Sequence, residues 1–377
     1  MRREEGGVKS KLFLLSFWII FLFFLWKPIA SIGKEIELTV IYTSNTLGEV
    51  EPCLTCPESG ENGGLARRAQ FIKRAKQEDK SILVLDSGNA LAIDYFRQAR
   101  EREKAQKRAE VVLRIYEKIG YDALNIGDID LGLGIDYLKN LQERIKFPFL
   151  SANLIERKTK RPVFHPYIIK EVGSAKIGII GLLTPSLPPS LQKEIRTYFV
   201  EDPIKAVLHW VKGPMSHCHY IFALAHLSSP EMDALAQKIP EISLIIGGRD
   251  RSFVFPKMVG QSLVVQTDAF GFHVGKIHLR LWKRSLDWFD GLPRARLLKQ
   301  IEEIQRKIEE VTDEAEKRNL HQVKESMIEQ ANKLSAPRDR NIYENSFALM
   351  HPKLESDKEI ELFIESHRDQ LKRPIPD

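Results

Sequence analysis

The stretch GYDALNIGDIDLG (residues 120–132) decides the fold class, because a strand-like apolar run ends in a polar turn that contains glycine. The same arrangement occurs twice upstream, in IELTVIYTSNTLGEVEP (36–52) and in SILVLDSGN (81–89). Between these runs, Gly64 to Lys76 and residues 100–118 place apolar residues on one helical face. Strands that alternate with helices predict an α/β architecture, with the functional turns at the carboxyl ends of the strands.

The alternation continues to about residue 284. Apolar runs flanked by turn residues predict further buried strands at FPFLSANL (147–154), AKIGIIGLL (175–183), YIFALAH (220–226) and ISLIIGG (242–248). Segments 253–256, 262–267 and 272–282 are predicted to be the closing strands of an antiparallel sheet.

Composition limits the classes of function. The 377 residues are 43% hydrophobic, enough for a sizeable core in one large domain or two small ones. The 57 basic and 51 acidic residues give a mixed surface with a net charge of +6. Because no dense basic stripe is interleaved with aromatic residues, we do not expect nucleic-acid binding.

The N-terminus has the pattern of an export segment. Four basic residues among the first eleven precede an uncharged apolar run from Leu12 to Trp26. The run is shorter than the roughly 20 residues that a spanning helix needs. Cleavage after Gly33 and retention as a membrane anchor both remain open. Either way, we expect the rest of the chain outside the cytoplasm, in the periplasm or at the cell surface.

A heptad pattern follows the alternating region. Apolar residues recur at four-three spacing from Leu297 to Val311, the pattern breaks near Glu316–Asn319, and it resumes at Leu320. The break predicts either a turn between two antiparallel helices or a stutter in a coiled coil. The tail is predicted to contain one helix, 356–371. The expected domains are 1–33 (signal peptide or anchor), 34–284 (α/β domain), 285–337 (helical hairpin or coiled coil) and 338–377 (tail).

Residues 36–276 resemble the N-terminal domain of 5′-nucleotidases and UDP-sugar hydrolases, which are calcineurin-like metallophosphoesterases. The phrases that carry the resemblance, besides those at 120–132 and 147–154, are TSNTLGEVEP (43–52), GGLARRAQFIKR (63–74), LVLDSGNAL (83–91), KIGIIGLLTP (176–185), FALAHLSSPE (222–231) and LIIGGRDR (244–251). The resemblance implies a four-layer αββα sandwich, followed here by the helical hairpin or coiled coil.

The resemblance also implies which positions would hold two divalent metals. The family binds them through Asp-x-His, Gly-Asp, Gly-Asn-His-Glu, a lone His and Gly-His-x-His. In this chain the first Asp and His correspond to Asn45 and Leu47, and the bridging Asp corresponds to Asn89. The Asn ligand corresponds to Asp128, and the His that protonates the leaving group corresponds to Ile129.

The remaining positions continue this pattern. The Asp that orients the leaving-group His corresponds to Gly132, the lone His is kept as His226, and the last two His correspond to Arg249 and Arg251. Leucine cannot ligate a metal, neutral asparagine is a poor bridge between two dications, and guanidinium groups repel them. The resemblance therefore implies a hydrolase by ancestry in which most two-metal ligands are replaced.

Two alternatives stay open for the remaining polar residues. Asp128, His226, Asn89 and Asn45 can ligate at most a single divalent metal, or they hydrogen-bond one another while Asp128 pairs with Arg249. Arg249 and Arg251 can bind a small anionic or phosphorylated ligand, since a guanidinium fork matches phosphate and carboxylate. Alternatively they fill the vacated volume through salt bridges with Asp128, Asp130 or Asp86.

A Cys-x-x-Cys motif, Cys53 to Cys56, follows the first turn. It can form a structural disulfide, half a zinc site or a redox pair. The chain looks like a cysteine-containing relative of the 5′-nucleotidase-like seleno-/cysteine protein family. That resemblance implies thiol-redox catalysis by Cys53 and Cys56 with a redox partner.

The sequence leaves open whether the chain is a phosphate-ester hydrolase, a thiol oxidoreductase or no enzyme. The leading prediction is an extracytoplasmic 5′-nucleotidase-like protein with a replaced metal site and a thiol-redox role. The alternative is a non-catalytic, membrane-associated binding or scaffold protein that acts through residues 292–335, including helical self-association.

Overall fold

The computed structural model describes residues 35–52, 61–93, 99–282, 287–337 and 340–371. The chain divides into two compact units, Met1–Glu35 and Ile36–Asp377, and both large sheets belong to the second. The predicted export segment and the pair Cys53 and Cys56 lie outside the described residues.

One sheet has seven strands in the order β14-β15-β13-β1-β2-β3-β4. Its strands are β1 (Ile36–Thr43), β2 (Ile82–Asp86), β3 (Ala123–Asn125), β4 (Phe149–Leu150), β13 (His273–Leu281), β14 (Trp288–Asp290) and β15 (Asn341–Leu349). Strands β1 to β4 run parallel, and β13 is antiparallel to both β1 and β15. The turns after β1, β2 and β3 therefore meet at one edge of this sheet.

The other large sheet has six strands in the order β11-β12-β10-β9-β7-β6. Its strands are β6 (Tyr167–Val172), β7 (Ala175–Leu183), β9 (Tyr220–His226), β10 (Ile242–Gly247), β11 (Val254–Val259) and β12 (Ser262–Gln266). The inner strands β7, β9, β10 and β12 are parallel, and antiparallel β6 and β11 form the two edges. A two-stranded sheet pairs β5 (Leu154–Glu156) with β8 (Tyr198–Val200).

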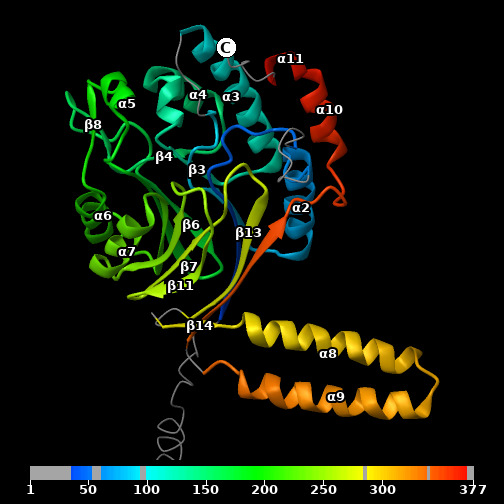
Figure 1. Ribbon diagram of the computed structural model, residues 1–377. Coiled ribbons are helices and arrows are strands. Elements are labelled where there is room, and N and C mark those ends of the chain that lie inside the picture. Colours follow the sequence, from blue (N-terminus) through cyan, green and yellow to red (C-terminus); the bar gives the residue numbers. More distant parts are fainter. Residues whose placement is uncertain (1–34, 53–60, 94–98, 283–286, 338–339, 372–377) are drawn as a thin grey trace, which may run out of the picture. The chain divides into compact units, whose positions relative to one another are not determined.

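Helices cover the outer faces of both sheets (Figure 1). The described helices are α2 (Leu65–Glu78), α3 (Ala99–Ile119), the 3₁₀ turn η1 (Asp130–Leu133), α4 (Ile135–Arg144), α5 (Pro189–Glu194), α6 (Pro203–Lys212), α7 (Ser229–Lys238), α8 (Leu292–Glu310), α9 (Glu314–Lys333), α10 (Lys358–Ser366) and α11 (Arg368–Leu371). Of these, α8 and α9 do not cover a sheet face and lie apart as a pair (Figure 1).

Three apolar layers separate these elements, and β1 shows why. Val40 and Tyr42 lie in the core between the two sheets, whereas Ile41 packs with residues of α2, α3 and α10. Successive strand residues point to opposite faces, so one strand serves two cores. The third core joins the six-stranded sheet to α6 and α7. The four-layer αββα sandwich predicted from the sequence is confirmed.

The prediction that segments 253–256, 262–267 and 272–282 close one antiparallel sheet is wrong. β12 is parallel to β10, and β13 pairs with β1 in the other sheet. Every residue of β12 is buried, as is typical of a strand covered on both faces. β13 alternates between buried and half-buried residues after Val274 and Gly275.

The tail contains a strand that the sequence analysis did not predict. β15 inserts between β13 and β14 and extends the seven-stranded sheet. Its Asn345 accepts a hydrogen bond from the buried Tyr42 hydroxyl at 2.9 Å. The single helix predicted at 356–371 is divided into α10 and α11, with His367 as the C-cap of α10.

Residues 292–333 form the predicted helical hairpin, in which α8 and α9 lie side by side (Figure 1). The break occurs earlier than Glu316–Asn319, at Val311 to Asp313. The Asp313 side chain caps α9 by accepting a hydrogen bond from the Glu316 N–H, a start pattern that fixes the turn here. Within the described ranges, no helix is long and apolar enough to cross a membrane.

Candidate functional site

Two turns at the carboxyl edge of the seven-stranded sheet form the floor of the site. The N–H groups of Asn45, Leu47 and Gly48 donate to the backbone of residues 88–90 at 3.0, 2.8 and 3.1 Å. Asn45, Leu47 and Asn89 have positive φ values of 48°, 54° and 56°. Such values are strained for residues other than glycine, and they cluster at functional sites.

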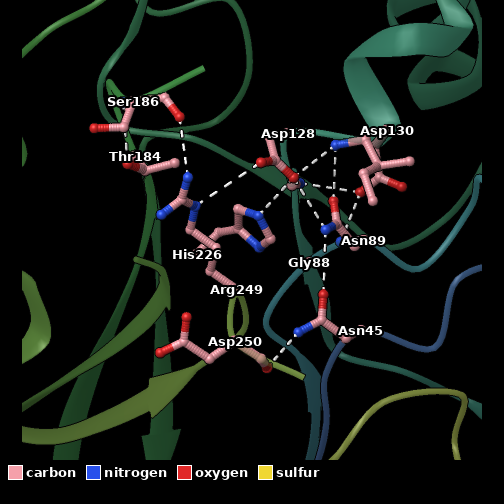
Figure 2. A network of polar contacts seen from close by, with 12 residues as sticks. Asn45, Gly88, Asn89, Asp128, Asp130, Thr184, Ser186, His226, Arg249 and Asp250 are labelled. Atoms are coloured by element: carbon pink, nitrogen blue, oxygen red, sulfur yellow. Dashed lines mark hydrogen bonds and ion pairs between the residues drawn. The ribbon is translucent and has the colours of Figure 1, made fainter. Parts of the chain in front are cut away.

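The four residues predicted as ligands of at most one metal are brought together and bond directly to one another (Figure 2). The Asn45 side chain donates to the Asp250 carbonyl at 2.8 Å. The Asn89 amide donates to Asn45 Oδ1 at 3.2 Å and to Asp128 Oδ1 at 3.0 Å. His226 Nε2 lies 2.9 Å from the same Asp128 oxygen. We call these four residues together with Arg249 the cleft cluster.

Asp128 is the charged centre of the cleft cluster. Burial alone would raise the pKa of this carboxyl, but hydrogen bonds from His226 and Asn89 and the charge of Arg249 lower the pKa to about 2. Because Asp128 is ionised, His226 donates from Nε2. His226 Nδ1 is buried and has no hydrogen-bond partner among the described residues.

The two arginines that were predicted to bind an anion lie in different surroundings. Arg249 donates from Nη2 to the Ser186 carbonyl at 3.0 Å, and its Nε lies 3.9 Å from Asp128 Oδ2 (Figure 2). Its side chain is 28% exposed, so it lies above Asp128 at the surface of the site. The Arg251 guanidinium instead lies 5.8 Å from the centre of the Phe270 ring.

Asp130 forms no salt bridge with Arg249 or Arg251, which the sequence analysis gave as one alternative. Its buried carboxylate accepts hydrogen bonds from the N–H groups of Asn89 and Leu91 at 2.9 Å and of Gly127 at 3.0 Å. Burial raises the pKa of this carboxyl, and the backbone donors oppose that rise. Asp130 therefore holds the turns after β2 and β3 together.

Asp86 also lies away from Arg249 and Arg251. Its carboxylate accepts from the Gly88 N–H at 2.9 Å, from the Thr43 hydroxyl at 2.6 Å and from the Tyr116 hydroxyl at 3.1 Å. The fully buried Arg68 donates to the same Tyr116 hydroxyl at 3.0 Å. Burial raises the pKa of Asp86 to about 6. We call Asp86, Asp130, Arg68 and Tyr116 the supporting cluster.

Sequence reasoning missed the partners that are backbone groups. Ser186 and Asp250 contribute carbonyl oxygens, and no side-chain motif encodes these. Asp250 also accepts from the N–H and hydroxyl of Ser229 at 2.9 Å, which fixes the turn after β10 to the start of α7. Among the described residues, no group of three or more His, Cys, Asp and Glu is arranged to hold a metal ion.

Comparison with known proteins gives one consistent result. No family model matches the chain. The snake venom 5′-nucleotidase of Naja atra is 28% identical over 234 residues, which are 58% of this chain and 42% of that protein. The 5′-nucleotidase of Rattus norvegicus is 28% identical over 250 residues, which are 63% of this chain and 42% of that protein. The chain thus spans less than half the length of these relatives.

Solved structures agree on the fold. The calcineurin-like phosphoesterase YfkN from Bacillus subtilis matches with a TM-score of 0.63 at 17% identity, over 90% of this chain and 98% of that one. The 5′-nucleotidase precursor from Thermus thermophilus matches with a TM-score of 0.59 at 21% identity, over 88% and 58%. The chain therefore contains a 5′-nucleotidase-like domain with the calcineurin-like metallophosphoesterase fold.

Proposed function

We propose that this 5′-nucleotidase-like domain does not carry a two-metal hydrolytic centre, and that its cleft binds a small phosphate- or carboxylate-bearing anion through Arg249. The observation that carries the proposal is the direct hydrogen bonding within the cleft cluster. Asn89 and His226 both bond Asp128 Oδ1, and Arg249 lies 3.9 Å from the other oxygen.

The donor set argues against a pair of divalent ions. The cleft cluster offers one carboxylate, one imidazole, two neutral amides and a guanidinium cation. Two dications close together need bridging negative charge, and a single carboxylate beside a guanidinium supplies too little. The residues do not fit the metal centre that the fold family implies, so we derive no catalytic step from it.

A single divalent ion remains the competing occupant. It would draw on Asp128 and His226, with the amides of Asn45 and Asn89 as weaker oxygen ligands. Such an ion would have to replace the Asn89–Asp128 and His226–Asp128 hydrogen bonds, at 3.0 and 2.9 Å, and to approach Arg249. We therefore favour the anion.

Arg249 is suited to bind an anion because its side chain is held in place while part of its guanidinium group still has no partner among the described residues. Its Nη2 is fixed by the Ser186 carbonyl and its Nε faces Asp128, while Nη1 has no hydrogen-bond or ion-pair partner among the described residues. The guanidinium is also partly exposed. A fork fixed in this way presents its outer edge to a phosphate or carboxylate with little loss of side-chain entropy.

Calorimetric titration with inorganic phosphate tests this proposal. We expect the full-length protein, purified without chelator, to bind phosphate without added metal. Arg249→Gln should weaken binding by about tenfold or more, as expected for the loss of a charged hydrogen bond. Arg251→Gln, the matched control, should change binding little. About two equivalents of manganese, iron or zinc in the purified protein would instead restore the two-metal hydrolase.

A thiol-redox role is the second candidate. The turn that carries Asn45 continues to Pro52, the last described residue before Cys53 and Cys56. On this proposal the two thiols interconvert with a disulfide, and the electrons pass to or from a partner dithiol. Cys53→Ser should abolish turnover with such a partner while leaving phosphate binding intact. Unchanged turnover would leave the pair as a structural disulfide or a zinc half-site.

Location outside the cytoplasm is proposed from the N-terminal pattern, whose residues lie outside the described part. Protease is added to cells whose outer layer has been permeabilised and whose cytoplasmic membrane is intact. It should digest the protein and leave a cytoplasmic marker undigested. Protection equal to that of the cytoplasmic marker would contradict this location.

A further inference from the structure

The hairpin of α8 and α9 fully buries few of its apolar side chains. Within these two helices only Ile308 and Ala331 are buried. The seam residues Leu297, Ile301 and Met327 are half-buried. Four further apolar side chains are exposed, namely Leu298 (38%), Val323 (41%), Ile328 (39%) and Leu334 (37%). Two helices that bury so little gain little stability from their own packing.

The rest of the described chain does not cover this seam. α8 packs on α9 and, at its first residues, on β15. That attachment is made where the Gly291 N–H donates to the Tyr343 carbonyl at 2.9 Å. α9 packs on α8, with Lys324 Nζ donating to Gln305 Oε1 at 2.5 Å. Two apolar-seamed helices therefore lack the second pair that a helical bundle normally has.

Charge is divided along the hairpin. Its tip half, residues 302–318, carries seven acidic residues and four basic ones, a net charge of −3. Its root half, residues 292–301 and 319–334, carries five basic residues and two acidic ones, a net charge of +3 with His321 neutral. This division favours pairing of the tip half of one hairpin with the root half of another.

We propose that the hairpin binds the hairpin of a second copy of this chain, tip half against root half, as an antiparallel four-helix bundle. A two-fold axis across the middle of the bundle creates two equivalent contacts, in each of which the acidic tip half of one copy lies against the basic root half of the other. The same pairing covers the open seam of both copies. Helices of 19 and 20 residues are about 28–30 Å long, so the two attached domains lie at opposite ends and do not collide.

Charge reversal with rescue tests this arrangement. The root-reversed variant is Arg296→Glu, Lys299→Glu and Lys333→Glu, and the tip-reversed variant is Glu302→Lys, Glu303→Lys and Glu310→Lys. Each variant gives both halves of its hairpin the same sign, −3 and −3 or +3 and +3. Neither variant should pair with itself, whereas an equimolar mixture should form a one-to-one dimer.

Sedimentation of the full-length chain is the measurement, and circular dichroism checks that each variant keeps its helices. We expect wild type to dimerise and the dimer to weaken between 0.05 M and 0.5 M salt, because the charges are exposed. A monomeric wild type at about 50 μM, a dimer that both reversals leave intact, or a mixture that fails to pair would overturn the proposal. Wild type that binds anionic lipid vesicles and stays monomeric would do so as well.

Discussion

The cleft cluster and the supporting cluster meet at the turns after β2 and β3, yet they are built differently. The supporting cluster keeps two buried carboxylates and a buried guanidinium, bonded to backbone N–H groups and hydroxyls. The cleft cluster has two neutral amides that bond each other and a single carboxylate. The comparison indicates that the turns are held by the supporting cluster. Residues facing the cleft can then change their chemistry without changing the backbone.

Asp130→Ala should be the most damaging test of this difference. The substitution leaves three buried N–H groups without an acceptor, and each such group costs about 1–3 kcal/mol. We expect a loss of about 3–5 kcal/mol in the free energy of unfolding, measured with urea. Asn45→Ala, the matched change in the cleft cluster, should cost about 1 kcal/mol. Equal losses would mean that the turns depend on both clusters.

Arg68→Met should have the next largest effect. Arg68 is fully buried, and its removal leaves the Asp86 carboxylate without a compensating positive charge. Arg68 reaches Asp86 through the Tyr116 hydroxyl rather than by a direct ion pair, and loss of this buried positive charge should cost about 3 kcal/mol. Adding Asp86→Asn removes the uncompensated charge, so the double variant should recover part of the loss in unfolding free energy. A double variant with strictly additive losses would show that the two charges do not interact.

The pH dependence of stability should differ in sign between Asp86 of the supporting cluster and Asp128 of the cleft cluster. Burial raises the folded-state pKa of Asp86 from about 3.8 to about 6, so ionised Asp86 destabilises the fold above that pH. The penalty disappears as pH falls from about 6 to about 4, because the folded state then binds the proton more tightly than the unfolded one. Asp128 has the opposite sign, and its contribution is lost only below about pH 4.

Urea unfolding of wild type and Asp86→Asn at several pH values measures this effect. We expect wild type to gain about 2 kcal/mol relative to Asp86→Asn between about pH 7 and about pH 4.5. The difference between the two proteins is the quantity to compare, because surface carboxylates titrate equally in both. A difference that does not vary with pH would mean that Asp86 is not desolvated.

The fold was predictable where the sequence repeats a local pattern. Apolar runs that end in polar turns predicted the parallel strands. The side chains that follow those strands lie together, namely Asn45, Asn89 and Asp128 from one sheet and His226 from the other. The pairing partner of a strand is not local, and so β12 and β13 were assigned to the wrong arrangement. β15 was missed because the four polar and five apolar residues of NIYENSFAL do not alternate, and its place depends on distant partners such as Tyr42.

The site was predictable to the same extent. Side chains that follow strands were identified, but carbonyl acceptors such as that of Ser186 have no sequence pattern. Arg249 and Arg251 looked equivalent because they are two residues apart in one turn. The backbone of that turn directs the Arg249 side chain toward Asp128 and the Arg251 side chain toward Phe270. Because both residues are arginines, the sequence does not distinguish the two directions.

The smallest expected effect is also the one that assigns a role to Arg249. Its Nε lies 3.9 Å from Asp128 and its side chain is partly exposed, so solvent screens the ion pair. Arg249→Gln should therefore change the free energy of unfolding by less than about 0.5 kcal/mol. If Arg249 instead fills a vacated metal site, its loss leaves Asp128 with Asn89 and His226 but without a neighbouring cation, and we expect a cost of about 2 kcal/mol or more. Urea unfolding of Arg249→Gln beside Arg251→Gln thus decides whether this guanidinium stabilises the fold or is kept available for a ligand.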